Sequence, residues 1–119
     1  MLTNKRILIG NFIAQGAVAA YRLVAYGDQD DTVKLATGAA GEKLRGVSCD
    51  ADAADGKRVD IAQLGIAPVI YGAAVARGDR VKADAEGRAI PIAAGDAFVG
   101  VAEVAGVAGD RGAILIAHG

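Results

Sequence analysis

The sequence has few of the residues that carry chemistry or provide aromatic contact surfaces. It contains no Trp, two Phe, three Tyr, one Cys and one His among 119 residues. One Cys cannot form an internal disulfide, and one Cys with one His cannot supply the four ligands of a structural zinc site. Scarce aromatic rings also leave little surface on which sugars or nucleotide bases could stack. We interpret Cys49 as a small buried apolar residue on a strand.

The sequence also lacks an excess of either charge and any long apolar run. The 13 basic and 14 acidic residues give a formal net charge of −1 and are spread along the chain. Without a basic stripe, no nucleic-acid partner is expected. The stretch KRILIGNFIAQGAVAA loosely imitates a secretory signal, but Asn11, Gln15 and two glycines interrupt it, and no run approaches the roughly 18 apolar residues of a membrane span. We expect a soluble protein that is neither secreted nor bound to a membrane.

Candidate catalytic residues are equally scarce. A Ser-His-Asp triad would need Ser48, the only serine, beside His118, and no nucleophile-elbow sequence surrounds Ser48. The stretch GAAGEK at residues 38–43 lacks the spacing between glycines, and the Ser or Thr after Lys43, that a phosphate loop requires. The sequence therefore predicts no enzyme, no catalytic residue and no cofactor.

The densest acidic cluster is DQDD, which contains Asp28, Asp30 and Asp31. Hard cations bind such clusters, but the central Gly and distal Glu of a calcium loop are absent. We interpret the cluster as a solvated loop between two strands, because like charges repel and stay in water. No metal site is assigned.

Glycine is abundant, with 17 residues, and short alternating apolar runs lie between turn signals. These runs predict strands at residues 21–26, 32–36, 44–49, 58–64, 67–71, 80–83, 89–92, 98–104 and 113–117. In the stretch RVKADAEGRAIPI, Asp84 opens and Gly87 closes a turn with the pattern of a type I turn followed by a left-handed glycine. This regular spacing is typical of an all-β sandwich or small barrel. One short helical turn is predicted at residues 72–77.

The first 20 residues have no clean period, and Asn11 and Gly16 weaken a helix there. Two interpretations stay open, an extended arm ordered by a partner and an element of the domain itself. We divide the chain into an N-terminal arm, residues 1–20, and a single β-domain, residues 21–119. A weak internal echo relates GD…VKLA…LRGV, within residues 27–47, to GD…VKAD…FVGV, within residues 78–101. Two related halves of a bent ribbon would explain the echo, and chance matching in a sequence of low diversity explains it nearly as well.

Three stretches carry a resemblance over nearly the full length: NKRILIGNFIAQGAVAAYRLVAYG, LRGVSCDADAADGKRVDIAQLGIAPVIYGAAVARGD and FVGVAEVAGVAGDRGAILIAHG. Together they resemble the capsid cement, or head decoration, proteins of tailed bacteriophages. The resemblance implies a structural virion protein, made in the host bacterial cytoplasm, that binds the outer surface of an expanded head and locks neighbouring capsid subunits together. It also implies a β-clip-like fold, an incomplete small barrel of short antiparallel strands, as in lambda-like head decoration proteins. The implied partner is the major capsid protein, and a homotrimer is favoured over a dimer.

Two hypotheses about individual residues follow from the resemblance. Contact with the capsid is assigned to apolar residues of the arm, which would add a strand to the edge of a capsid sheet; they are Ile7, Leu8, Ile9, Phe12 and Ile13. Deleting residues 2–14 is then expected to abolish binding to the shell and to leave the β-domain folded. Self-association is assigned to three residues of the segment 65–72, namely Ile66, Val69 and Tyr71. An ordinary core strand is the alternative for that segment, and the rival function for the whole chain is a small β-barrel module of a phage tail that binds carbohydrate or peptide.

Overall fold

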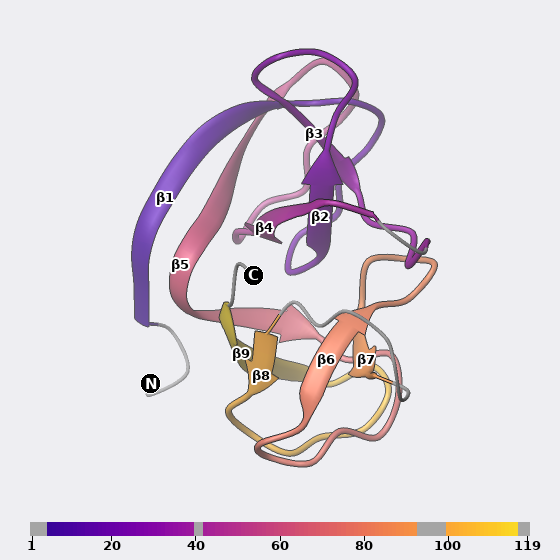
Figure 1. Ribbon diagram of the computed structural model, residues 1–119. Coiled ribbons are helices and arrows are strands. Elements are labelled where there is room, and N and C mark those ends of the chain that lie inside the picture. The colour runs from indigo at the N-terminus through magenta and orange to yellow at the C-terminus, as the bar shows by residue number, and fades with distance from the viewer. Residues whose placement is uncertain (1–4, 40–41, 93–99, 117–119) are drawn as a thin grey trace.

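The computed structural model describes residues 5–39, 42–92 and 100–116, and within them the chain forms nine β-strands and no helix (Figure 1). This confirms the predicted all-β class. The strands are β1 (Lys5–Ala14), β2 (Leu23–Tyr26), β3 (Thr32–Leu35), β4 (Leu44–Ser48), β5 (Arg58–Ile70), β6 (Arg80–Ala83), β7 (Ala89–Pro91), β8 (Gly100–Ala102) and β9 (Arg111–Ile116). The predicted start of β8 at residues 98–99, the predicted end of β9 at residue 117, and His118 lie outside the described residues.

The β6–β7 hairpin forms as its turn sequence predicts. Gly87 has φ 75°, and its amide donates a hydrogen bond to the Asp84 carbonyl at 3.2 Å. The Asp84 carboxylate accepts hydrogen bonds from the amides of Glu86 and Arg88, both at 2.9 Å, and pairs with the Arg88 guanidinium at 2.8 Å. All of these contacts lie within five residues of sequence, so local chemistry alone specifies this turn.

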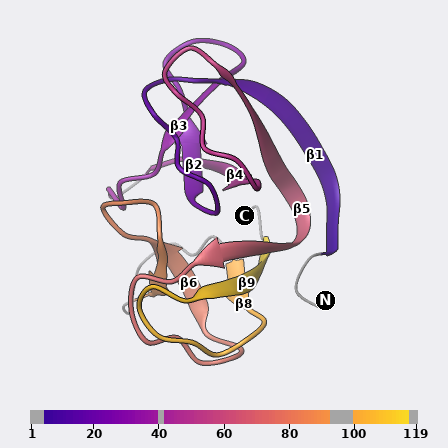
Figure 2. The same ribbon diagram turned by 180° about the vertical axis from the view of Figure 1, so that it is seen from behind.

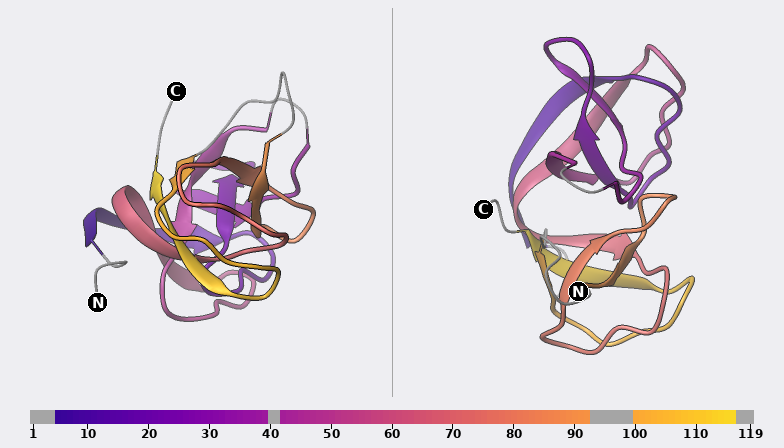
Figure 3. Two further views of the ribbon diagram at one scale, coloured as in Figure 1. Left: turned by 90° about the horizontal axis from the view of Figure 1, so that it is seen from below. Right: turned by 45° about the vertical axis from the view of Figure 1, so that its right-hand side comes forward.

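All nine strands belong to one sheet, in the order β1-β3-β2-β4-β5-β9-β8-β6-β7, and an additional pairing of β1 with β5 closes part of the sheet on itself. Figures 1 and 2 show two lobes. The first lobe contains β1–β4 and the first part of β5, and the second contains the rest of β5 and β6–β9. The views in Figure 3 show that β5 runs through both lobes and that the sheet is curled. The predicted incomplete barrel is confirmed in this arrangement.

Residues 58–70 form one strand, where the sequence predicted two strands separated at Gly65. Gly65 has φ 94° and lies at an irregularity in the β1–β5 register. A Cβ atom at this position would collide with the backbone of Lys5 and Ile7. The glycine therefore marks a bulge where β1 passes close to β5, and not a chain reversal. Because β5 continues past it, one strand pairs first with β1 and β4 and then with β9.

The N-terminal segment is a strand of the same sheet. β1 pairs antiparallel with β5 from Lys5 to Ile13, and parallel with β3 at Ile13 and Ala14. Farther along, Val18 forms an isolated bridge with Ala53. Ala14 and Val18 are buried. Of the two interpretations of the first 20 residues, the described ones among them follow the second: they are an element of the domain, and not an arm outside it.

The two lobes repeat one pattern of pairing. The strand order β3-β2-β4-β5 of the first lobe has the same connectivity as β7-β6-β8-β9 of the second. Single hydrogen bonds repeat too: the Gly56 amide donates to Ala14, and the Gly109 amide donates to Tyr71, each at 2.8 Å. The isolated bridge between Val18 and Ala53 has its counterpart in the second lobe. The chain is thus built from two related halves.

The internal sequence echo identified only part of this repeat. It matched LRGV to FVGV, and the structure does relate Gly46 of β4 to Gly100 of β8, because Gly46 pairs with Val24 of β2 and Gly100 with Val81 of β6. It also matched VKLA to VKAD, which lie on β3 and β6. The pairing pattern relates β3 to β7 and β2 to β6, so this second match was wrong. Any two strands with alternating apolar residues can produce such a sequence match. Only the strands with which they pair show whether the two occupy equivalent places in the fold.

The predicted helical turn at residues 72–77 does not form. The Gly72 amide donates to the Ala89 carbonyl at 2.9 Å, and Val75 and Gly106 exchange two hydrogen bonds of 2.9 Å. No helix is present at residues 72–77, and the antiparallel bridge between Val75 and Gly106 requires an extended backbone at Val75 that a helical turn does not have.

The buried side chains form two clusters, one within the first lobe and a larger one that extends across both lobes and contains Tyr71. The first lobe buries Ala14, Val18, Val24, Val33, Ala53, Val59 and Ile61 together. In the larger cluster, Tyr71 is fully buried; its hydroxyl donates to the Val104 carbonyl at 2.6 Å and accepts from the Ala113 amide at 3.4 Å. The Tyr71 hydroxyl is therefore buried but hydrogen-bonded, as buried polar groups usually are.

Replacing Tyr71 by Phe is expected to lower the free energy of unfolding by about 1–2 kcal/mol, because the Val104 carbonyl loses its donor. Burial raises the pKa of Tyr71, against the opposing effect of its hydrogen bonds with Ala113 and Val104. The folded protein keeps the Tyr71 phenol neutral, whereas the same phenol ionises near pH 10 in the unfolded chain. The stability that the buried phenol contributes is therefore present below about pH 10 and is lost as the pH rises further.

Urea denaturation of both proteins at about pH 8 and about pH 11 measures the two effects. Tyr71→Phe should lose less stability than the wild type between these pH values. An equal loss in the two proteins would contradict the assignment to Tyr71.

Candidate docking surface

Over most of its length, the outer edge of β1 is apolar and has no partner strand among the described residues. Among the described residues, β3 pairs with this edge only at Ile13 and Ala14, and β5 occupies the opposite edge. Ile7 is 78% exposed, Leu8 46% and Ile9 47%. Soluble proteins usually protect such edges with charges, Pro or short strands, but β1 has ten residues and carries charge only at its first two positions. This edge is therefore suited to pairing with another chain.

The exposed apolar surface extends from β1 onto β5. Leu64 is 43% exposed, and its Cα is paired with that of Leu8, so the two side chains lie on one face of the sheet. We call Ile7, Leu8, Ile9 and Leu64 the β1 patch. Beyond it, Leu115 of β9 is also 43% exposed and pairs with the half-buried Ile66 of β5. Leu8 and Leu64 thus form a pair of exposed aliphatic side chains on neighbouring strands, and exposed apolar surface of this kind is typical of an interaction site.

The structure divides the five residues assigned to capsid contact. Ile7, Leu8 and Ile9 are exposed, as such a contact requires. Phe12 is half-buried and packs against the core cluster of the first lobe. Ile13 is half-buried as well, and its amide donates to the Asp31 carbonyl at 2.9 Å. Only the first three residues are therefore free to meet a partner with their side chains.

The assignment of self-association to the segment 65–72 was wrong for two of its three residues. Val69 and Tyr71 are fully buried in the protein's own core. Val69 points inward because alternate residues of β5 face the core, and Tyr71, directly after the end of β5, continues this alternation. Ile66, on the opposite face, is half-buried and lies beside Leu115.

An open cleft of about 340 Å³ lies beside β1, where Ile9 and Asn11 face the loop after β4. Two polar contacts lie within it: Arg6 pairs with Asp50 at 3.0 Å, and the Asn11 side-chain amide donates a hydrogen bond to Asp60 at 2.9 Å.

Cys49 also lines this cleft. It is half-buried just after β4, and not fully buried on a strand as predicted. Burial raises the pKa of the Cys49 thiol, although the neighbouring Arg6 lowers it. A raised pKa keeps the sulfur in its unreactive thiol form.

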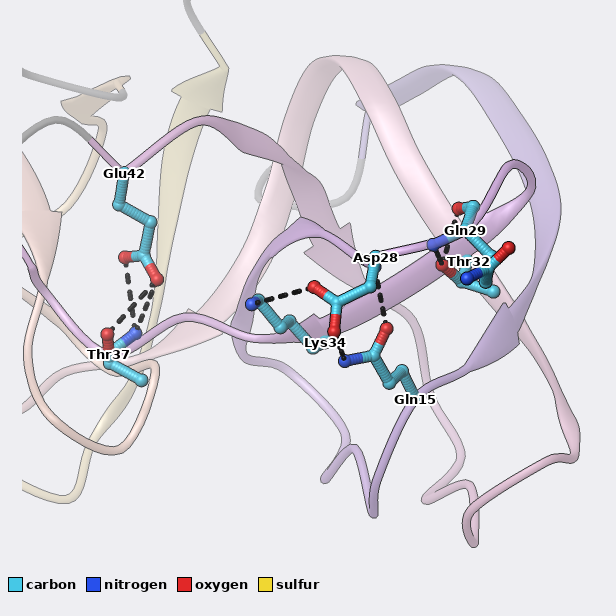
Figure 4. Close-up of polar contacts among 7 residues, drawn as sticks. All are labelled: Gln15, Asp28, Gln29, Thr32, Lys34, Thr37 and Glu42. Atoms are coloured by element: carbon cyan, nitrogen blue, oxygen red, sulfur yellow. Dashed lines mark hydrogen bonds and ion pairs between the residues drawn. The ribbon is translucent and has the colours of Figure 1, made fainter.

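The acidic cluster DQDD is held by contacts within the chain. Asp28 is 3.6 Å from the Lys34 ammonium and accepts a hydrogen bond from the Gln15 amide at 3.0 Å, as Figure 4 shows. Asp31 pairs with Arg58 at 3.1 Å. Figure 4 also shows Glu42 accepting hydrogen bonds from Thr37 in the next loop. Over residues 5–39, 42–92 and 100–116, no group of three or more His, Cys, Asp or Glu could hold a metal ion.

One arrangement of side chains has no signal in the sequence. The guanidinium carbon of Arg45 on β4 lies 4.8 Å from the ring centre of Phe12 on β1 and 5.5 Å from that of Tyr26 on β2. Residues 12, 26 and 45 are far apart in sequence, and only the pairing of their strands brings them together. Tyr26 is 53% exposed, so the group lies at the surface.

Comparisons with known proteins agree with this all-β architecture. The crystal structure of the head fiber gp8.5 N base of bacteriophage phi29 is similar with a TM-score of 0.69 and 23% sequence identity, and the match covers 92% of this chain and 93% of that one. No curated protein matches the sequence significantly. In the described part of the chain, no helix is long and apolar enough to cross a membrane. Residues 5–118 match the phage cement protein family, which confirms the resemblance noted in the sequence, and the chain therefore belongs to this family.

Proposed function

We propose that the protein is a capsid cement protein that binds the outer surface of an expanded phage head and stabilises the contacts between capsid subunits. The observation that carries this proposal is the apolar edge of β1 before Ile13, which has no partner strand within the described residues and along which Ile7, Leu8 and Ile9 are exposed. A protein that holds a shell together needs contact area and not a reaction centre. Membership of the phage cement protein family supports the same role.

Strand addition is the binding mode that this edge favours. A segment of the capsid subunit would pair with the free backbone groups of β1, and the β1 patch would be covered by its side chains. Each fully buried aliphatic side chain contributes about 1.5–3 kcal/mol. Repeated over the many copies on a head, such contacts add up to a shell that resists internal pressure.

We further propose that the protein acts as a homotrimer, as icosahedral shells offer threefold positions and oligomers follow the symmetry of their site. Ile66, one of the residues first assigned to self-association, is half-buried and is paired with Leu115 of β9, which is 43% exposed, so we place the contact between copies at these two residues. Analytical ultracentrifugation of the free protein and of Leu115→Glu measures this directly. A monomeric wild type would contradict the trimer.

The test of head binding replaces Ile7 and Leu8 with Glu and measures the copies bound to purified, expanded heads of the encoding phage by co-sedimentation. Loss of two buried aliphatic side chains should weaken binding at least roughly 100-fold. Val107→Glu is the matched control, since Val107 is 59% exposed but lies in the loop between β8 and β9. Wild-type occupancy by the double variant would refute the β1 patch as the contact. A wild-type protein that does not bind heads would refute the function itself.

A further inference from the structure

Arg45 is held between two aromatic rings at the surface of the first lobe. Its guanidinium carbon lies 4.8 Å from the centre of the Phe12 ring and 5.5 Å from the centre of the Tyr26 ring. Stacking of this kind fixes the plane of the guanidinium group and restricts the rotamers of a long side chain. The group is therefore ordered before any partner arrives.

No acceptor within the described residues uses the donors of Arg45. Other arginines of the chain are paired with carboxylates: Arg6 with Asp50 at 3.0 Å, and Arg88 with Asp84 at 2.8 Å. Arg45 has only its two ring contacts in residues 5–39, 42–92 and 100–116. A guanidinium has five N–H donors in a fixed planar fork, which matches the two oxygens of a carboxylate. The side chain is thus oriented and charged, and its donors remain available.

Arg45 and its two aromatic neighbours lie near the free edge of β1. Phe12 lies on β1, three residues after Ile9, where the free stretch of the edge ends. At the next residues, Ile13 and Ala14, β3 takes up that same edge, and β2 and β4 follow β3 in the sheet. The 4.8 Å contact with the Phe12 ring therefore places the Arg45 guanidinium beside β1, close to where the free stretch of its edge ends.

We propose that Arg45, oriented by Phe12 and Tyr26, binds an Asp or Glu carboxylate of the capsid subunit that pairs with β1. This inference rests on the proposed function and adds to it the chemistry of a second contact. A protein carboxylate fits better than a nucleic-acid phosphate, because a phosphate backbone is bound by several cations together, whereas the chain has a net charge of −1. In this arrangement Phe12 is a positioning residue, which contributes by orienting Arg45 and not by touching the capsid subunit itself.

The test compares Arg45→Lys and Arg45→Met with the wild type in equilibrium binding to expanded heads. Lys keeps the charge but loses the planar fork, and Met keeps the apolar stem over Phe12. We expect each variant to bind about tenfold or more weakly, because a charge-assisted bidentate contact is lost. Added NaCl should weaken the wild type more than Arg45→Met, since only the wild type has the ion pair to screen. Arg77→Met is the control, because Arg77 is an exposed arginine on a loop before β6.

The outcomes separate the two proposals. Wild-type binding by both Arg45 variants, with loss of binding on Ile7→Glu and Leu8→Glu, would overturn the carboxylate contact and leave the proposed function intact. An equal loss in Arg77→Met would show a general effect of charge and would also overturn it. Competition by free double-stranded DNA would identify a phosphate as the ligand, against the proposal. If the wild type does not bind heads, both proposals fail. Thermal unfolding of each variant shows whether Arg45→Met is folded, and Arg45→Lys provides the answer if it is not.

Discussion

Deletion of residues 2–14 is expected to unfold the first lobe, and not to leave a folded domain as the sequence led us to expect. The deletion removes β1, which pairs with β5 along the stretch from Lys5 to Ile13. It also removes Phe12 and Ala14, which pack into the core of that lobe. Loss of a large core side chain alone costs about 3–5 kcal/mol, and the total stability of a domain is about 5–15 kcal/mol. We therefore expect no cooperative unfolding transition for the truncated chain.

Circular dichroism during thermal and urea unfolding measures this effect. The double variant with Glu at positions 7 and 8 is the control, because it changes exposed side chains of β1 and keeps the strand. It should unfold cooperatively near the wild-type midpoint. A cooperative transition of the truncated protein at the wild-type temperature would show instead that β1 is dispensable for folding, as an arm would be. The deletion is consequently unsuitable as a test of capsid binding, and side-chain substitutions are needed.

Gly112→Ala is expected to destabilise the second lobe by about 3 kcal/mol. A Cβ atom at this position would overlap the ring of Tyr71. That ring cannot easily move, because it is fully buried and its hydroxyl is bonded to Val104 at 2.6 Å. Overpacking in a dense core forces side chains from their rotamers or shifts the backbone, and both changes cost free energy.

Urea denaturation with Gly109→Ala as the control measures the cost of the overlap. Gly109 lies three residues earlier with open space around it, but its φ is 90°. Its substitution should cost about 1 kcal/mol, the typical penalty for an L-residue in the left-handed region. Equal losses in the two variants would mean that the Tyr71 ring adjusts to the extra carbon, contrary to the expectation.

The sequence by itself determined the features that depend on neighbouring residues. The turn from Asp84 to Gly87 formed as predicted because its carboxylate, its glycine and its hydrogen bonds all lie within five residues. The all-β class followed from short alternating runs and turn signals for the same reason. The family was also readable in the sequence, since its resemblance was spread over nearly the full chain.

Tertiary structure decided which strand meets which, and hence which side chains are free. Gly65 gave the same signal as a turn, but the approach of β1 made it a bulge within β5. Val69 and Ile7 are both β-branched residues in apolar strands, yet the first is fully buried and the second is 78% exposed. Arg45 meets Phe12 and Tyr26 only because β1, β2 and β4 share one lobe. Burial and contact depend on pairings between distant segments, and local sequence carries no record of those pairings.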